Sequence, residues 1–375
     1  MAVSGKVYGK SQFAVGIFNK NATAFETAAA ADANYEMLPV VNVSPPVLNL
    51  VESGEIRSNN AGMVELDIDQ FRSQKGGFVT MDFECPAERE ILVRLLANVL
   101  QDHGESGSGP YVHTIQATSG AALARPDFTG SSSAGIPSLF DIGLYYPESA
   151  QDIMITSATL SSFTMNFDMS EGRCLLSGSF YSGMASSSKF LVEQSLSDNS
   201  GVPNITSATP TFVEAYFDTK TLDVDGTANV VAPVITGVSF TFENNVSRVG
   251  RNSDGDAEAY AWGIPSVNIT GEISFMYDAN FDYGSGGNVL QDFLSGNTAT
   301  LTLKQGDGTV STAGEMNIVA EIYATGHDMD PNADTGAVIT VPFKVVQPTA
   351  SGVASGTAFS FTFADSTNAA AWSTT

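Results

Sequence analysis

The sequence has few of the residues on which enzymes and metal proteins depend. Its 375 residues include two cysteines, two tryptophans and three histidines, and only 15% are charged. Cys85 and Cys174 cannot make a disulfide framework, so we expect two reduced thiols. No histidine has the spacing of a metal site or a partner Cys or Asp in a known motif, and the nucleophile elbow of a Ser-His-Asp hydrolase does not occur. We therefore expect no catalytic residues, no metal site, no cofactor and no enzymatic activity.

Positive charge is especially scarce. Lys and Arg number 16 against 41 Asp and Glu, and the net charge is −25. Gripping a nucleic-acid backbone needs clustered Lys and Arg, so we expect no specific binding of DNA. An acidic surface suits a wall past which DNA moves, although acidity that only keeps the chain soluble is the simpler interpretation of composition alone. No run approaches the roughly 18 apolar residues of a spanning helix, so we expect no membrane partner.

Alternation with period two dominates the apolar pattern. In GVSFTFE at 237–243, Val238, Phe240 and Phe242 alternate with polar residues. This pattern is typical of an antiparallel strand with one face buried. The same pattern predicts strands over 76–84, 161–169, 267–277, 314–324, 337–346 and 358–365. With 43% hydrophobic residues to form a core, the sequence predicts a mainly β protein.

Two short amphipathic helices are predicted as well. The first covers 85–104, where Pro86 suits the first helical position and Gly104 the C-cap. Its leucines, isoleucine and valine form a single apolar stripe that must pack on something. The second covers 286–297, with Gly296 as its end.

Each predicted helix contains the five letters NVLQD, at 98–102 and again at 288–292, an offset of 190. A Glu five residues before an Arg precedes each copy, as Glu52 with Arg57 and Glu243 with Arg248, at an offset of 191. The order of strand, polar loop, glycine-containing strand and helix therefore occurs twice, which favours a duplicated domain.

The register of this repeat has an alternative, because 158–181 also resembles 237–275. We prefer the first register, since it aligns the helices. The stretch 195–211 is polar and has no period, so we place the boundary there. The predicted domains are residues 1–200, including an N-terminal arm, and residues 201–375, ending in strands and a tail.

Together these segments resemble the major tail tube proteins of tailed bacteriophages. The resemblance is carried by NLVESGEIRSNN with GGFVTMDFE, by PYVHTIQ, by SATLSSFTMNFDM with LLSGSFYSG, and by GVSFTFENNVSRVG with VNITGEISFMY and LQDFLSGN. It covers most of 40–325. Residues 117–150 depart from the pattern as extra loop sequence, and the C-terminal 40 residues find no place in it.

The resemblance implies two tandem tail-tube-type β-sandwich or barrel domains, each with a short flanking helix. It implies a structural virion protein that forms a homotrimeric ring with pseudo-sixfold symmetry. Stacked rings would make the hollow tail tube of a siphovirus-like phage, through which DNA is delivered. Implied partners are other copies of the chain, the tape measure, tail terminator and distal tail proteins, and genome DNA that passes without specific binding. The chain would be made in the host cytoplasm.

By the same resemblance, loops 56–75 and 244–264 would stack one ring on the next. Candidate stacking residues are Glu55, Arg57, Arg248 and Arg251. The alternative is that these are solvated loop charges that contribute little. Candidate acidic residues facing the lumen are Asp82, Glu84, Asp168 and Glu272.

Two other functions stay open from the sequence. A tail fibre or adhesin of similar composition would carry a receptor-binding surface and would not form a tube. A glycan-active enzyme would need a carboxylate pair in an aromatic cleft, which two tryptophans support poorly. The segment GHDMDPNAD at 326–334 begins like a calcium loop, but Ala333 and Ile339 replace the Gly and Glu that the loop needs, so a polar turn is expected.

Overall fold

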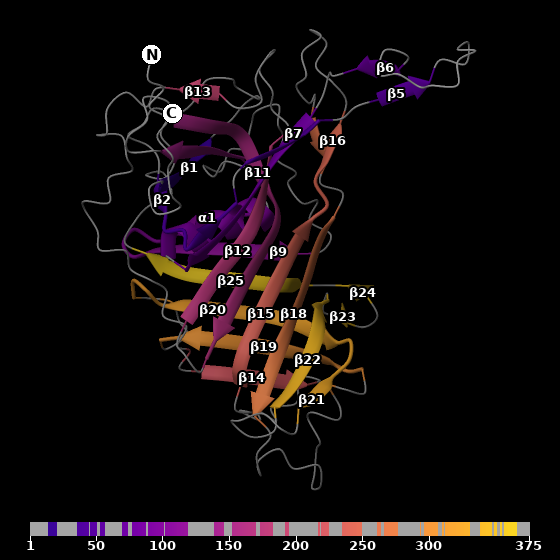
Figure 1. The fold of residues 1–375 in the computed structure, drawn as a ribbon. Coiled ribbons are helices and arrows are strands. Elements are labelled where there is room, and N and C mark those ends of the chain that lie inside the picture. Colours follow the sequence, from indigo (N-terminus) through magenta and orange to yellow (C-terminus); the bar gives the residue numbers. More distant parts are fainter. Residues whose placement is uncertain are drawn as a thin grey trace, which may run out of the picture.

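The fold is mainly β, as the alternating pattern predicts (Figure 1). The computed structural model describes residues 14–20, 36–44, 46–50, 53–56, 70–73, 77–87, 89–100, 102–118, 139–145, 152–169, 173–182, 192–194, 217, 219–224, 235–249, 261–263, 266–276, 293, 296–306, 310, 312–330, 338–346, 349–350, 353–354 and 356–365. Within these residues, 19 strands form one antiparallel hydrogen-bonded network. The network folds into the three sheets described next.

The large sheet carries most of the predicted strands. Its order is β3 (Asn42–Val43) with β4 (Val47–Leu50), then β7 (Gly77–Pro86), β12 (Arg173–Ser182), β11 (Asp152–Asp168), β15 (Ile235–Asn244), β18 (Val267–Met276), β22 (Val338–Val345) and β21 (Asp328–Asp330). At its centre β11, from the first predicted domain, pairs with β15, from the second, over Ser162–Asp168. Strands of both halves therefore share one sheet.

The second sheet crosses behind the large sheet at a steep angle (Figure 1). Its order is β14 (Thr219–Val224), β19 (Thr298–Gln305), β20 (Met316–Ala324), β25 (Thr357–Asp365), β9 (Tyr111–Thr118) and β8 (Gly104–Ser106). The two sheets join at a corner, where β20 also pairs with β22. Here too the halves meet, because β9 pairs with β25.

Phenylalanine rings fill the space between these two sheets. The Phe359 ring lies 5.5 Å from Phe240 and 5.2 Å from Phe242, measured between ring centroids, in edge-to-face contact. Such aromatic pairs add to the hydrophobic burial of their rings. The alternation that identifies β15 and β25 in the sequence is therefore the alternation that places their rings in one core.

A small third sheet shares a buried apolar core with the helix α1 (Arg89–Leu100). It consists of β2 (Glu36–Leu38), β1 (Ala14–Lys20), β10 (Leu139–Tyr145), the N-terminal part of β11 and β13 (Val192–Gln194). Residues 117–150, expected as extra loop, thus contribute a strand, β10. The C-terminal 40 residues, which had no place in the resemblance, supply β22 and β25.

The prediction of helix 85–104 is too long. Cys85 and Pro86 belong to β7, because Pro86 pairs with Leu175 and the Ala87 N–H donates to the Cys174 carbonyl at 2.9 Å. Gly104 belongs to β8. Residues 91–100 are buried on every side, and Arg94 and Asn98 are buried with them. One apolar stripe predicts a helix with a solvent-exposed face, whereas residues 91–100 of α1 have no such face and the helix packs against β11, β9 and β15.

Of the second predicted helix, 286–297, the structure describes Phe293 and the residues from Gly296 onward. Phe293 is helical and buried. Gly296 has φ +103° and donates its N–H to the Phe293 carbonyl at 3.2 Å. This left-handed conformation is the one expected where a glycine ends a helix.

The first NVLQD copy fastens α1 to the sheets through its polar ends. The Asn98 Oδ1 accepts hydrogen bonds from the Leu160 N–H at 2.9 Å and the Thr159 hydroxyl at 3.2 Å. The Asn244 amide donates to the Leu160 carbonyl at 3.1 Å. A β-bulge follows Leu160, and bulges leave backbone groups without ladder partners. The two asparagines supply those partners, and the Asp102 carboxylate accepts the Gln116 N–H at 2.6 Å.

We expect Asn98→Ala to lower the free energy of unfolding by about 2 kcal/mol, because it leaves the buried Leu160 N–H without its acceptor. Urea unfolding followed by circular dichroism measures this loss. Asn245→Ala is the matched control, since Asn245 is exposed, and it should change stability by less than about 0.5 kcal/mol. Equal losses in the two variants would show that the buried bond is not the cause.

Candidate functional site: the polar face of the large sheet

One face of the large sheet is buried and the opposite face is polar. The strand registers bring the polar side chains into rows that run across the strands. One row reads Glu84, Ser177, Thr164, Thr241, Thr270 and Lys344, one residue from each of β7, β12, β11, β15, β18 and β22. Residues directly opposite each other in an antiparallel pair point to the same face. We call this surface the polar face.

The four predicted acidic residues all lie on the polar face. Asp82 and Glu84 are on β7, Asp168 is at the end of β11, and Glu272 is on β18. Asp82 and Glu272 are exposed, while Glu84 and Asp168 are partly exposed. The structure places them on one face, over β7, β11 and β18, and whether the polar face lines a lumen stays a prediction.

The sequence analysis missed two further acidic residues of this face. Glu243 is exposed on β15 and lies in the row of Asp82, through Ser179 and Ser162. The sequence did contain a signal for Glu243, because this residue continues the alternating polar positions Ser239 and Thr241 of β15. Asp328 on β21 is exposed as well and pairs with Thr340; only the sheet topology places it here.

The charge of the polar face is therefore negative at neutral pH. Lys344 is the cation of this face whose side chain the structure describes, and Arg173 stands in register with Asp168. The two positive charges are outnumbered by the carboxylates of Asp82, Glu84, Asp168, Glu243, Glu272 and Asp328. A surface of one sign repels polyanions over about one Debye length, roughly 8 Å in physiological salt.

Between the charges the polar face is built of hydroxyl groups. The Thr164 and Thr241 hydroxyls are 3.1 Å apart across the β11–β15 junction, and those of Ser274 and Thr340 are 3.2 Å apart across β18 and β22. These cross-strand bonds satisfy hydroxyls within the face itself. The Thr164–Thr241 bond also ties a strand of the first half to a strand of the second.

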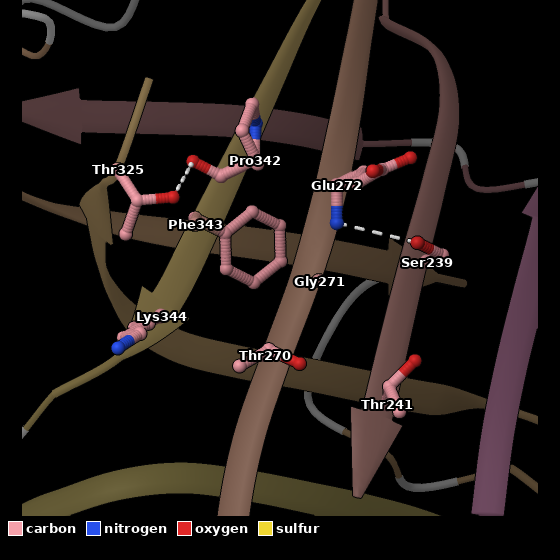
Figure 2. A pocket seen from close by; sticks show the side chains of 9 residues that line it. All are labelled: Ser239, Thr241, Thr270, Gly271, Glu272, Thr325, Pro342, Phe343 and Lys344. Carbon is pink, nitrogen blue, oxygen red and sulfur yellow. Dashed lines mark hydrogen bonds between the residues drawn. The ribbon is translucent and has the colours of Figure 1, made fainter. Parts of the chain in front are cut away.

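A hollow of about 420 Å³ lies over β15, β18 and β22 (Figure 2). Ser239, Thr241, Thr270, Glu272 and Lys344 are among its lining residues. The Ser239 hydroxyl accepts the Glu272 N–H at 3.2 Å. The lining offers hydroxyls, one carboxylate and one ammonium group, without a histidine or thiol that could act as a nucleophile or base.

The candidate stacking residues lie in two loops of similar build. Glu55 belongs to β5 (Ser53–Ile56), which pairs with β6 (Gln70–Ser73), and Arg248 belongs to β16 (Ser247–Val249), which pairs with β17 (Ala261–Gly263). Figure 1 shows β5, β6 and β16 beyond the same end of the large sheet. Arg57 and Arg251 lie outside the described residues.

Other chemistry is sparse within the described part of the chain. No group of three or more His, Cys, Asp or Glu side chains there could hold a metal ion. Asp328 and Asp330 of the calcium-like segment form β21 instead of the expected turn. Cys85 and Cys174 form no disulfide and are buried, and burial, with a smaller effect of Cys85, raises the pKa of Cys174. No described helix is long and apolar enough to cross a membrane.

The remaining strands, β23 (Thr349–Ala350) and β24 (Val353–Ala354), pair only with each other among the described residues.

No protein family matches the sequence. No curated protein matches it. Among solved structures, the chain is similar to the SPP1 tail tube, with a TM-score of 0.27, 8% sequence identity, and coverage of 39% of this chain and 76% of that chain.

Proposed function

We propose that this chain is the structural subunit of a phage tail tube. Three copies form a ring, rings stack into a hollow tube, and the polar face lines the lumen. The observation that carries this proposal is the large sheet itself, in which both halves of the chain contribute neighbouring strands and all four predicted acidic residues share one face.

The polar face suits the wall of a DNA conduit. Its carboxylates repel the phosphate backbone, and several of its hydroxyls are bonded to one another. Genome DNA passes along such a wall without being held. The tape measure protein occupies the same lumen before ejection, and the terminator and distal tail proteins close the ends.

The strand order supports a ring with pseudo-sixfold symmetry. The first half supplies β3 with β4, then β7, β12 and β11, and the second half continues with β15, β18, β22 and β21. We expect neighbouring chains to pair their edge strands in the way that β11 pairs with β15 inside the chain. Closing three such sheets into a barrel removes the exposed edges of the large sheet.

The order of elements supports the duplication and the division at about residue 200. In the first half, β4 is followed by a loop with the hairpin β5–β6, then by β7 and α1. In the second, β15 is followed by a loop with the hairpin β16–β17, then by β18 and the helical Phe293. These paired hairpins are the contacts that we assign to ring stacking, through Glu55, Arg57, Arg248 and Arg251.

The β3–β4 edge is the surface at which one chain meets the next. Val41 is 70% exposed beside β3 and Val47 is 50% exposed on β4, two of the three large apolar side chains that are exposed among the described residues. Exposed apolar side chains on an edge strand promote aggregation of a monomer, whereas in an assembly they are buried between chains.

We expect the double variant Val41→Asp, Val47→Asp to fold normally and to lose assembly, since both side chains are solvated in the isolated chain. Circular dichroism checks the fold, and sedimentation velocity measures assembly at concentrations where the wild type forms rings or tubes. Tyr323→Asp is the control, because Tyr323 is the third exposed apolar residue, at 39%, on a different sheet. Assembly by the double variant as efficient as the wild type's would contradict the assigned edge.

A further inference from the structure

Two of the three histidines meet where α1 ends. The His103 Nε2 lies 3.1 Å from the His113 Nδ1, and the ring centroids are 5.4 Å apart. His113 is fully buried on β9, opposite Phe363 of β25. His103 follows α1 after Asp102, whose carboxylate holds the Gln116 N–H of β9. Two side chains next to each other in the sequence therefore fasten the end of α1 to β9.

Few charged groups surround this pair. The Glu105 carboxylate on β8 lies 4.0 Å from the His113 Nδ1, with its side chain 23% exposed. The other titratable or charged residues on the packed elements are Arg89, Glu90 and Arg94 on α1, Asp102 after α1, Tyr111 on β9 and Asp365 on β25. Glu105 is thus a carboxylate placed to compensate a positive charge on His113.

A hydrogen bond between two imidazole nitrogens needs one donor and one acceptor. The neutral pair meets this need with one proton between the rings. The pair with a single positive charge meets it too, because an imidazolium on His113 donates to the His103 Nε2 and faces Glu105. When both rings are charged, two N–H groups point at each other, and His113 has no route to water.

We propose that the His103–His113 pair is an acid-sensitive latch, which holds the end of α1 on β9 while one of the rings can accept a hydrogen bond and opens when both rings are protonated. This inference is independent of the proposed function. Opening moves His103 outward, because His113 is enclosed. It loosens β9, which is the strand through which the first half pairs with β25 of the second.

The direction of the pH effect follows from the environment of His103. Burial, and to a smaller extent His113, lower the pKa of His103 from 6.5 to about 4. Below pH 6.5 the unfolded chain takes up a proton that the folded chain does not, so stability falls as the pH falls from about 6.5 to about 4. A difference of this size multiplies the unfolding constant by on the order of a hundredfold.

The test compares His103→Asn with the wild type and with His327→Asn. Asparagine keeps a hydrogen-bonding side chain and cannot titrate, while His327 is an exposed histidine outside the pair. Urea unfolding at pH 7.0, 5.5 and 4.5 should show that the free energy of unfolding falls steeply with falling pH in the wild type and in His327→Asn. Over this pH range we expect the unfolding constant of the wild type to rise on the order of a hundredfold more than that of His103→Asn. Identical pH profiles in all three proteins would overturn the latch.

Hydrogen exchange of the wild type tests the same point without a variant, should His103→Asn fail to fold. We expect the amides of 111–118 to lose protection between pH 6.5 and 4.5, after correction for the intrinsic exchange rate, while those of 235–244 in the large sheet keep it. Unchanged relative protection of the two strands would also overturn the proposal.

Discussion

Gly271→Ala should destabilise the protein by about 3 kcal/mol or more, one of the largest effects of a single methyl group in this chain. A Cβ at Gly271 would overlap the Ser239 carbonyl oxygen and the Phe343 ring. The carbonyl belongs to the neighbouring strand β15, and the ring is buried against Phe240 at 5.6 Å between centroids. Neither can move without shifting a strand or the core, and overpacking of this kind costs about 1–3 kcal/mol or more.

Two other glycines of the large sheet make this prediction a ranked series. At Gly178 an added Cβ would lie 2.8 Å from the Ser162 carbonyl oxygen and 3.0 Å from the Phe83 ring. At Gly237 it would meet the Phe167 carbonyl oxygen at 3.7 Å, which is an ordinary contact. We expect the loss of stability in urea to follow the order Gly271→Ala, Gly178→Ala, Gly237→Ala, with the last near zero. A Gly237→Ala loss as large as that of Gly271→Ala would contradict this packing.

Removal of β25 should abolish folding. A chain that ends after Ala354 lacks the strand that pairs with β9 on one side and β20 on the other. It also lacks the buried side chains of Phe359, Phe361 and Phe363, each worth roughly 1.5–3 kcal/mol of burial. Their sum, with the lost pairing on two edges, is comparable to the whole stability of a typical domain, about 5–15 kcal/mol.

The control for this truncation is a chain that ends after Ser366, which keeps every described strand. We expect the longer chain to be soluble, with cooperative thermal unfolding. The shorter chain should be insoluble, or soluble without a cooperative transition. A cooperative, soluble short chain would show that the first and second halves do not depend on β25.

The strands were predictable because alternation is a local signal. Phe240 and Phe242 on β15 and Phe359 and Phe361 on β25 face the core in register with the sequence pattern. The pairing of β25 with β9 was not predictable, since about 240 residues separate the two strands and no local feature encodes the choice of partner. The place of Asp328 on the polar face was not predictable either, because it depends on the pairing of β21 with β22 and of β22 with β18.

The candidate site was predictable in part. Acidic residues at polar positions of a strand must face away from the core, and this rule brings Asp82, Glu84, Asp168 and Glu272 to one side. The burial of Asn98 and Arg94 was not, because a polar residue opposite an apolar stripe indicates solvent unless another sheet covers the helix. In this chain residues 91–100 are all buried, and α1 packs against β11, β9 and β15.

The measurement that tests the central claim most directly is electron microscopy of the purified chain, with end-on class averages and the mass of each ring. The proposed function predicts hollow rings or tubes with a sixfold outline and three chains per ring, and an inner wall built from the large sheet. Compact particles that stay monomeric at every salt and protein concentration, and also when mixed with preformed tube ends, would contradict it and favour a fibre or adhesin instead.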